Sequence, residues 1–216
     1  MRPVFKIPLS SRCFDKVWGV TMDARKPRGP YAKGSAKREE IIEKAIEAFG
    51  RTGYHGTSMR EIAANCDLSQ AGLLHHFPSK EDLLLAIVAV RERIADDNPY
   101  TYKAQGWREA AREQVILNEQ NEALTRLWAN LVGEATDPAH PAHDYFKTRY
   151  ANNRAGNAQN FAEDAGHQSP TEEDKIKAAL MTALWDGLQT QWLIDESFDM
   201  KPAFEYAIKM LTEYKA

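Results

Sequence analysis

The sequence is poor in cysteine and has no long apolar run. Its 216 residues include two cysteines, Cys13 and Cys66, which are too few for a disulfide framework, and we expect Cys66 to be a reduced, buried thiol. The longest apolar run, Leu83 to Val90, has eight residues and is bracketed by Asp82 and Arg91. A membrane-spanning helix needs roughly 20 such residues. Since no signal peptide is evident either, we expect a cytoplasmic protein.

Motifs that bind phosphate groups or activate a nucleophile are also missing. The sequence has no glycine-rich phosphate loop, no nucleophile elbow and no paired-cysteine metal motif, so we expect neither an enzyme nor a cofactor. His140 and His143, with Asp144 beside them and His167 further along, are an alternative reading as a metal site. Proline between the first two histidines and an expected loop setting argue against a helical pair of His ligands. We therefore expect no metal.

The net charge of −3 is small but unevenly distributed. Residues 1–80 contain 14 Lys and Arg against 8 Asp and Glu, whereas residues 81–216 contain 14 against 23. A basic half attracts nucleic acid, and contacts to phosphates make such binding salt-dependent. Apolar residues make up 43% of the chain, which is enough for a sizeable core in one domain or two small ones.

The most informative segment, Thr57 to Glu81, lies at the end of the basic half. Ser58 followed three residues later by Glu61 predicts a capping box, so a helix should begin at about Ser58. Small and apolar residues then recur at helical spacing, which suits close packing against a neighbouring helix. These residues are Met59, Ile62, Ala63 and Cys66.

A turn and a second short helix follow directly. Asp67 tolerates the left-handed backbone of a tight turn, and Ser69 predicts the cap of a helix over residues 70–76. Pro78 ends this helix, and Ser79 begins a long one. Two short helices joined by a tight turn are typical of a helix-turn-helix, whose second helix carries polar groups to base edges.

An ordered series of residues extends this pattern upstream and downstream. The series is Phe49, Gly53-Tyr54, Thr57-Ser58, Ile62-Ala63, Leu68-Ser69, His76-Phe77 and Ser79-Lys80-Glu81. Over roughly Ser35 to Val90 the chain therefore resembles the DNA-binding domain of the tetracycline-repressor (TetR) family of bacterial transcription regulators. The resemblance implies an all-α fold of about nine helices. It also implies a basic flexible tail over 1–34, a helix-turn-helix domain over 35–82 and a helical effector-binding and dimerisation domain over 83–216.

The resemblance also implies a set of DNA contacts. The set is Thr57, Ser58, Ser69, Gln70, Ala71, Gly72, Leu74, His75 and Lys80. Gln70 to Gly72 should face base edges, where Gln pairs bidentately with adenine, although Gln70 as a merely solvated residue is the alternative. His75 and Lys80 should approach phosphates, again with a plain surface role as the alternative. Leu74 stands where the family usually has a tyrosine, which puts one phosphate contact in doubt.

Beyond Asp97 the chain reads as five further amphipathic helices, with no strand pattern. The strongest helical patterns run over Thr171–Glu196 and Lys201–Tyr214. The others run over Trp107–Asn118 and Asn121–Ala135, and from about Pro141 into a polar stretch, Asn152–Gly166, where the pattern fades.

In the resembling family, the last two helices pair with their two-fold mates, and the sequence gives them wide apolar faces. The residues expected at a homodimer interface are Leu184, Leu188, Trp192, Phe204, Ile208 and Leu211. Closure of the monomer's own core is the alternative use of these faces. A symmetric dimer would read a pseudo-palindromic operator with half-sites about 34 to 36 Å apart.

The aromatic content of the helices after Asp97 suggests an apolar effector pocket. The expected lining is Trp107, Trp128, Tyr145, Phe146 and Trp185, although each of these alone is more often a core residue. The resemblance implies a repressor that an unknown small-molecule effector releases from double-stranded DNA. A helical small-molecule-binding protein without operator function is the alternative.

The N-terminal tail is rich in Lys, Arg, Pro and Gly, most of all at Arg25–Pro30. We expect it to be mostly disordered when free. It is either a DNA arm that reaches the minor groove or a solubilising leader. A start at Met22 is a further alternative, since the sequence from there would be a normal beginning for the family.

Overall fold

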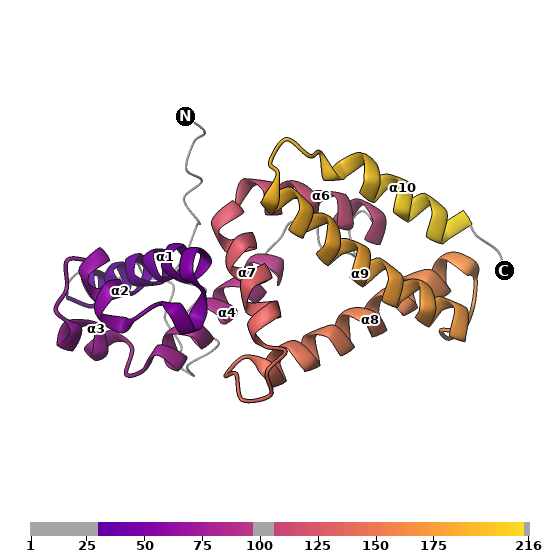
Figure 1. Cartoon of the computed structure of the whole chain (residues 1–216). Coiled ribbons are helices and arrows are strands. Elements are labelled where there is room, and N and C mark those ends of the chain that lie inside the picture. The colour runs from indigo at the N-terminus through magenta and orange to yellow at the C-terminus, as the bar shows by residue number, and fades with distance from the viewer. Residues whose placement is uncertain (1–29, 97–105, 214–216) are drawn as a thin grey trace. The chain divides into compact units, whose positions relative to one another are not determined.

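A computed structural model describes residues 30–96 and 106–213, and these residues contain no strand. The expected all-α fold is confirmed, and the described ranges hold nine helices (Figure 1). The helices are α1 (Pro30–Gly56), α2 (Met59–Asn65), α3 (Gln70–His76), α4 (Lys80–Asp96), α6 (Trp107–Gln120), α7 (Glu122–Glu134), α8 (His143–Ala165), α9 (Glu172–Ile194) and α10 (Met200–Glu213). They fall into two compact units, Met1–Pro99 and Tyr100–Ala216.

Some sequence predictions concern residues that the structure does not describe. The basic stretch before Pro30, the alternative start at Met22, and Cys13 lie outside the described residues. Helix α1 begins at Pro30 and so includes residues 30–34, which the sequence assigned to the tail. The first unit contains all of α4, and the functional boundary expected after Asp82 stays a prediction. Within the described residues, no helix is long and apolar enough to cross a membrane.

Helix α1 is interrupted near its C-terminal end, at Gly53. Gly53 has φ 75° and ψ 172°, so the backbone leaves the helical conformation there, and the last residues form a separate short turn. Glycine adopts this positive φ without the clash of a Cβ atom. The interruption places Tyr54 against Phe49, with ring centroids 5.7 Å apart, which joins the turn to the core.

Side-chain caps define the two short helices that follow. Ser58 Oγ accepts the N–H of Glu61 at 3.1 Å, and Ser69 Oγ accepts the N–H of Gly72 at 3.0 Å. The expected capping box at Ser58 is only half formed, because the Glu61 carboxylate instead pairs with Arg51 at 3.0 Å. Asp67 adopts φ 54° in the turn, which confirms the predicted left-handed backbone.

The first unit closes around apolar faces from all four of its helices. Helix α1 packs against α2 and α4, and α3 packs mainly against α2. The large side chains that are fully buried there are Ile41, Ile42, Phe49, Ile62, Leu73, Phe77, Leu83, Leu84 and Ile87. Burying a side chain of this size stabilises the fold by about 1.5–3 kcal/mol relative to leaving it exposed. The short α3 is thereby anchored through Leu73 and Phe77.

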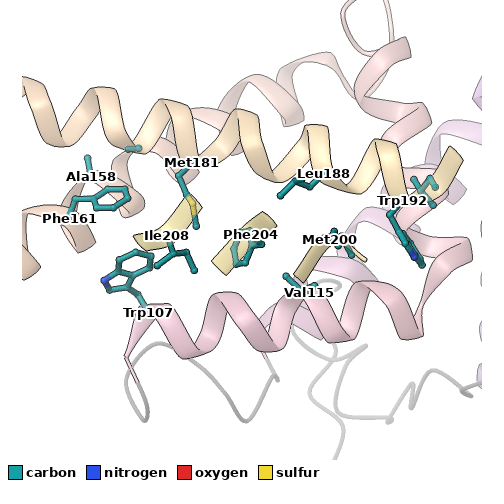
Figure 2. Packing of buried hydrophobic residues seen from close by; sticks show 12 residues of the cluster. Trp107, Val115, Ala158, Phe161, Met181, Leu188, Trp192, Met200, Phe204 and Ile208 are labelled. Carbon is teal, nitrogen blue, oxygen red and sulfur yellow. The ribbon is translucent and has the colours of Figure 1, made fainter. Parts of the chain in front are cut away.

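The second unit is built on the pairing of α8 with α9. Helices α10 and α7 pack on α9, and α6 packs on α10 and α7. Figure 2 shows its core, in which side chains from α6, α9 and α10 meet between the helices. Helix α8 continues to Ala165, although the sequence pattern fades at Asn152. The pattern is sparse because only Ala158, Phe161 and Ala162 are buried after that point, while most of the helix faces solvent.

Helix α9 begins with a complete capping box. Thr171 Oγ1 accepts the N–H of Asp174 at 3.2 Å, and the Asp174 carboxylate accepts the N–H of Thr171 at 2.8 Å. His167 Nδ1 lies 2.8 Å from the same carboxylate. Burial raises the pKa of Asp174, but the hydrogen bonds from Thr171 and His167 together outweigh this effect. The pKa therefore lies below its ordinary value.

Candidate nucleic-acid interface

Helix α3 turns one face to the core and leaves a polar face in solvent. Leu73 is fully buried, whereas Ser69, Gln70, Ala71 and His75 are exposed. Most of the residues that the sequence predicted for DNA contact are therefore accessible. Leu74 is also exposed, at 38%, so it presents an apolar side chain at the position where the resembling family usually has a tyrosine.

Gly72 lies in the first turn of α3, next to the Ser69 cap. A Cβ at this position would lie 3.4 Å from Ser69 Oγ and 3.7 Å from Leu68 Cδ2. These are ordinary or slightly tight contacts, so an alanine would fit with small adjustments. The structure therefore does not require glycine at this position.

Ser58 and Thr57 differ sharply although they are neighbours. Ser58 is exposed and caps α2, whereas Thr57 is only 2% exposed. The Thr57 hydroxyl is 2.7 Å from Thr52 Oγ1 and donates to the carbonyl oxygens of Gly53 at 2.8 Å and Ala48 at 3.2 Å. Thr57 thus fixes the end of α1. Its predicted phosphate contact is corrected, because its hydroxyl is buried.

Lys80 and His76 lie in the region where α3 ends. Lys80 Nζ lies 4.3 Å from the ring centroid of Tyr54, which places the ammonium over the aromatic ring at the end of α1. His76 is half-buried, and burial, followed by the charges of His75 and Arg38, lowers its pKa. The lowered pKa favours the neutral form of the His76 imidazole.

Lys37 and Arg38 of α1 have structural roles that the sequence pattern did not predict. Lys37 Nζ donates to the carbonyl oxygen of Cys66 at 2.7 Å, and Arg38 Nη1 donates to the carbonyl oxygen of His76. These contacts join residues 29 and 38 positions apart. Local sequence patterns do not predict contacts between such distant residues, although the sequence does show the excess of Lys and Arg in residues 1–80.

The five aromatic residues expected around an effector do not line one cavity. Trp128, Tyr145 and Phe146 do meet, with ring centroids 5.1 to 5.8 Å apart and edge-to-face geometry. Trp107 instead packs on Phe161 with centroids 5.2 Å apart. Trp185 packs on Phe204, with centroids 5.0 Å apart. The expectation of one common pocket is therefore wrong. The five side chains form three separate aromatic contacts, because they pack against rings of α8 or α10 and not around a shared cavity.

A buried amide pair lies beside the Trp185 contact and was missed by sequence reasoning. Asn118 of α6 donates to Gln189 of α9 at 2.9 Å, and both side chains are buried. A cavity of about 10 Å³ adjoins the pair. Its lining is Val115, Trp185, Leu188, Gln189, Met200 and Phe204. This volume suits one water molecule at most, so a larger ligand would have to separate the side chains.

A second hollow of about 550 Å³ lies between α8 and α9. Ala155, Ala158, Ile176 and Ala179 give it an apolar floor, and Arg154 and Lys175 lie at the same site. Its size is in the range of small-molecule sites, which are commonly about 300–1,000 Å³. It is open to solvent and contains none of the predicted pocket residues.

Four of the six residues expected at a dimer interface are core residues of the second unit. Leu188, Trp192, Phe204 and Ile208 are at most 9% exposed. Their side chains are therefore unavailable to another chain, and this part of the expectation is corrected. Leu184 is 38% exposed, and Leu211 is partly buried. The apolar residues of α9 and α10 that the sequence assigned to a dimer interface are therefore largely the ones that close the core of this chain.

The histidines around residue 140 have structural partners. His140 Nδ1 accepts the N–H of Ala142 at 3.1 Å, and its Nε2 lies 3.5 Å from the Glu134 carboxylate. His143 Nδ1 lies 2.8 Å from the carbonyl oxygen of Ala135. Among the described side chains, no cluster of three or more His, Cys, Asp and Glu could hold a metal ion.

The family match found by sequence comparison lies in the first unit. Residues 41–87 match the family described as bacterial regulatory proteins, tetR family. The HTH-type transcriptional regulator RutR of Escherichia coli K12 is 37% identical over 70 residues, which are 32% of this chain and 33% of RutR. UidR of the same strain is 43% identical over 51 residues, which are 24% of this chain and 26% of UidR. The matches thus span about a third or less of these curated relatives.

Solved structures resemble a larger part of the chain. A regulator from Saccharomonospora viridis, solved in complex with choline, has a TM-score of 0.66 at 22% identity, covering 83% of this chain and 97% of its own. NalD of Pseudomonas aeruginosa, the secondary repressor of the MexAB-OprM multidrug efflux pump, has a TM-score of 0.61 at 22% identity. That match covers 83% of this chain and 95% of NalD. These similarities extend the shared fold beyond the residues that the sequence comparisons match.

Proposed function

Because this chain belongs to the TetR family of bacterial regulatory proteins, we propose that it is a sequence-specific DNA-binding repressor whose operator binding is controlled by a small molecule. The observation that carries the proposal is the exposed polar face of α3 on a helix-turn-helix. A short helix with this exposure fits the major groove of B-DNA, whose base edges it can contact. A non-enzymatic role in the cytoplasm agrees with this proposal.

The proposed DNA surface separates base contacts from phosphate contacts. Gln70 is exposed in the first turn of α3 and has the bidentate amide that pairs with adenine, with Ala71 and Gly72 beside it. His75 and Lys80 follow on the chain and would approach the phosphates. Ser58 and Ser69 add hydroxyl groups at the helix starts, each also engaged as a cap. Thr57 has no place on this surface.

A homodimer is part of the proposal, and its interface shares only Leu184 with the one expected from the sequence. Ile176, Leu180 and Leu184 are 61%, 50% and 38% exposed and lie four residues apart, on one face of α9. Tyr206 and Met210 of α10 are 65% and 55% exposed at the same spacing. Apolar stripes of this kind mark interaction surfaces, and a second copy of the chain would cover them as a symmetric helix bundle.

Gly187 continues the α9 stripe after Leu184. It is exposed, and a Cβ added there would meet nothing within 4 Å in this chain. The glycine is therefore not required by packing inside the second unit. A partner helix could approach its backbone closely, which supports placing the stripe at the dimer interface.

The effector is proposed to act on the second unit. The amide pair of Asn118 and Gln189, next to Trp185 and Phe204, combines hydrogen-bonding groups with aromatic surface. A ligand that binds better to the DNA-incompetent state would shift the dimer toward that state by its difference in affinity. One structural neighbour binds choline, but the similarity at 22% identity concerns the fold alone.

Selection of bound duplexes from a random DNA library at physiological salt tests the proposal. An enriched inverted repeat is the expected result, because a dimer presents two α3 helices related by a two-fold axis. Binding should weaken as salt rises, with a log-log slope that falls by about one when Lys80 is changed to Gln. A folded dimer that enriches no sequence would favour the alternative, a helical small-molecule-binding protein without an operator.

A further inference from the structure

Two neighbouring residues of α1 each reach the end of one helix of the helix-turn-helix. Lys37 Nζ donates to the carbonyl oxygen of Cys66, the C-cap residue of α2, at 2.7 Å. Arg38 Nη1 donates to the carbonyl oxygen of His76, the last residue of α3. Lys37 therefore contacts the C-terminal end of α2, and Arg38 contacts the C-terminal end of α3.

Helix ends are where such donors have the largest effect. The last carbonyl groups of a helix have no partner within it and carry a partial negative charge. Helices α2 and α3 have only seven residues each, so they depend on caps and on tertiary contacts for their stability. A positively charged donor at the C-terminus of each helix gives a carbonyl oxygen a hydrogen-bond partner. Its charge also interacts favourably with the negative end of the helix dipole.

Arg38 contacts more than the carbonyl group. Its guanidinium carbon lies 4.0 Å from the ring centroid of Phe77, the C-cap residue of α3, which is 1% exposed. The charge of Asp82, in the first turn of α4, also acts on Arg38. One side chain of α1 is therefore linked to the end of α3 and the start of α4. Helix α3 otherwise packs mainly on α2.

We propose that Lys37 and Arg38 are positioning residues for DNA binding, which hold the C-terminal ends of α2 and α3 and so set the orientation of α3 in the groove. This inference rests on the proposed operator binding. Their cationic groups are directed at main-chain oxygens of this chain, and Lys37 is additionally paired with Glu40 at 2.9 Å. They therefore act through α2 and α3 and not through phosphates.

The test compares Arg38→Gln and Lys37→Gln with Arg38→Lys and with the control Lys44→Gln. Lys44 lies on the same helix, and its ammonium pairs with Glu47 at 3.1 Å. Affinity is measured over a range of salt concentrations on the duplex that the wild-type chain selects from a random library. Amide hydrogen exchange is measured residue by residue on the free proteins, so that this readout needs no DNA.

We expect Arg38→Gln to weaken binding about tenfold or more, since a hydrogen bond from a charged donor is lost. The salt slope should stay that of the wild type, and exchange should accelerate in α3 while α2 changes little. Lys37→Gln should show the converse selectivity, with faster exchange at the end of α2. Arg38→Lys should recover part of the affinity, and Lys44→Gln should bind within about twofold of the wild type.

Other outcomes overturn the inference. A salt slope reduced by about one with unchanged exchange would mean that these residues contact phosphates directly. Unchanged affinity in both variants would mean that they have no role in binding. If Arg38→Gln does not fold, Arg38→Lys and Lys37→Gln decide by the same criteria. A wild-type chain that selects no duplex would instead refute the proposed function, and uniform exchange across variants would then refute the positioning role separately.

Discussion

The units Met1–Pro99 and Tyr100–Ala216 stabilise their helices in different ways. In the first, short helices begin at serine caps, and basic side chains of α1 reach the ends of α2 and α3. In the second, longer helices share a continuous apolar core with one buried amide pair (Figure 2). The first arrangement fixes a small polar surface accurately. The second has fewer directional constraints, because much of its cohesion is apolar contact without hydrogen bonds. This difference would suit the effector response proposed above.

The largest effect should separate the two units by stability. Phe49→Ala removes a fully buried ring from the first unit and should cost about 3–5 kcal/mol of unfolding free energy. Four of the five tryptophans, Trp107, Trp128, Trp185 and Trp192, lie in the second unit, so their fluorescence follows mainly that unit. Chemical denaturation followed by circular dichroism and by fluorescence should give two separate transitions in the variant. Coincident transitions would show that the units unfold together.

A charge on the α9 stripe tests whether the second unit carries the dimer. Leu180→Glu should give a monomer by analytical ultracentrifugation, because a buried carboxylate lacks a partner in an apolar interface. Loss of two-site binding should reduce operator affinity by about 10²- to 10⁴-fold. The control is Leu85→Glu, at a residue of α4 that is 48% exposed in the first unit. A dimer that persists in Leu180→Glu would place the interface elsewhere.

The buried amides allow the polar part of the second core to be measured. Asn118→Ala leaves the Gln189 carbonyl without its donor and should destabilise the second unit by about 1–3 kcal/mol. The double variant Asn118→Leu with Gln189→Leu should recover part of this loss, because it removes both polar groups. Thermal unfolding followed by tryptophan fluorescence measures both. Equal losses in the two variants would mean that packing, and not hydrogen bonding, sets the cost.

Base recognition by the first unit is tested with Gln70→Ala. The variant should lose about 1–3 kcal/mol of binding free energy on the selected operator and little on random duplex DNA. Asn65→Ala, at an exposed residue of α2, serves as the control for surface changes near the motif. Equal losses on both kinds of duplex would exclude direct readout by Gln70.

The smallest effect concerns pH and the start of α9. The pKa of Asp174 is lowered in the folded chain, so its contribution to stability is present above the ordinary carboxyl value of 3.8 and is lost as pH falls through the folded value. Asp174→Asn should flatten the acid side of the stability profile of the second unit and leave the first unchanged. Unfolding midpoints measured by tryptophan fluorescence below pH 5 provide the comparison. An unaltered profile would mean that other carboxylates set the acid limit.

The sequence alone predicted the first unit well. The caps at Ser58 and Ser69, the left-handed turn at Asp67 and the bounds of α3 are all found in the structure. The resemblance to the TetR family is confirmed by the family match over residues 41–87. These features depend on residues within three or four positions of each other, so local spacing is sufficient to predict them.

Only the tertiary structure decided how the apolar residues of the second unit are used. The core is closed by Leu188 and Trp192 of α9 and by Phe204 and Ile208 of α10, whereas Leu180 of α9 faces outward. The spacing of apolar residues along the sequence does not reveal which face of a helix has a neighbour. The same holds for the buried Thr57 hydroxyl and for Lys37 and Arg38. Their partners are set by the crossing of helices that are distant in sequence, and such contacts exist only once the chain has folded.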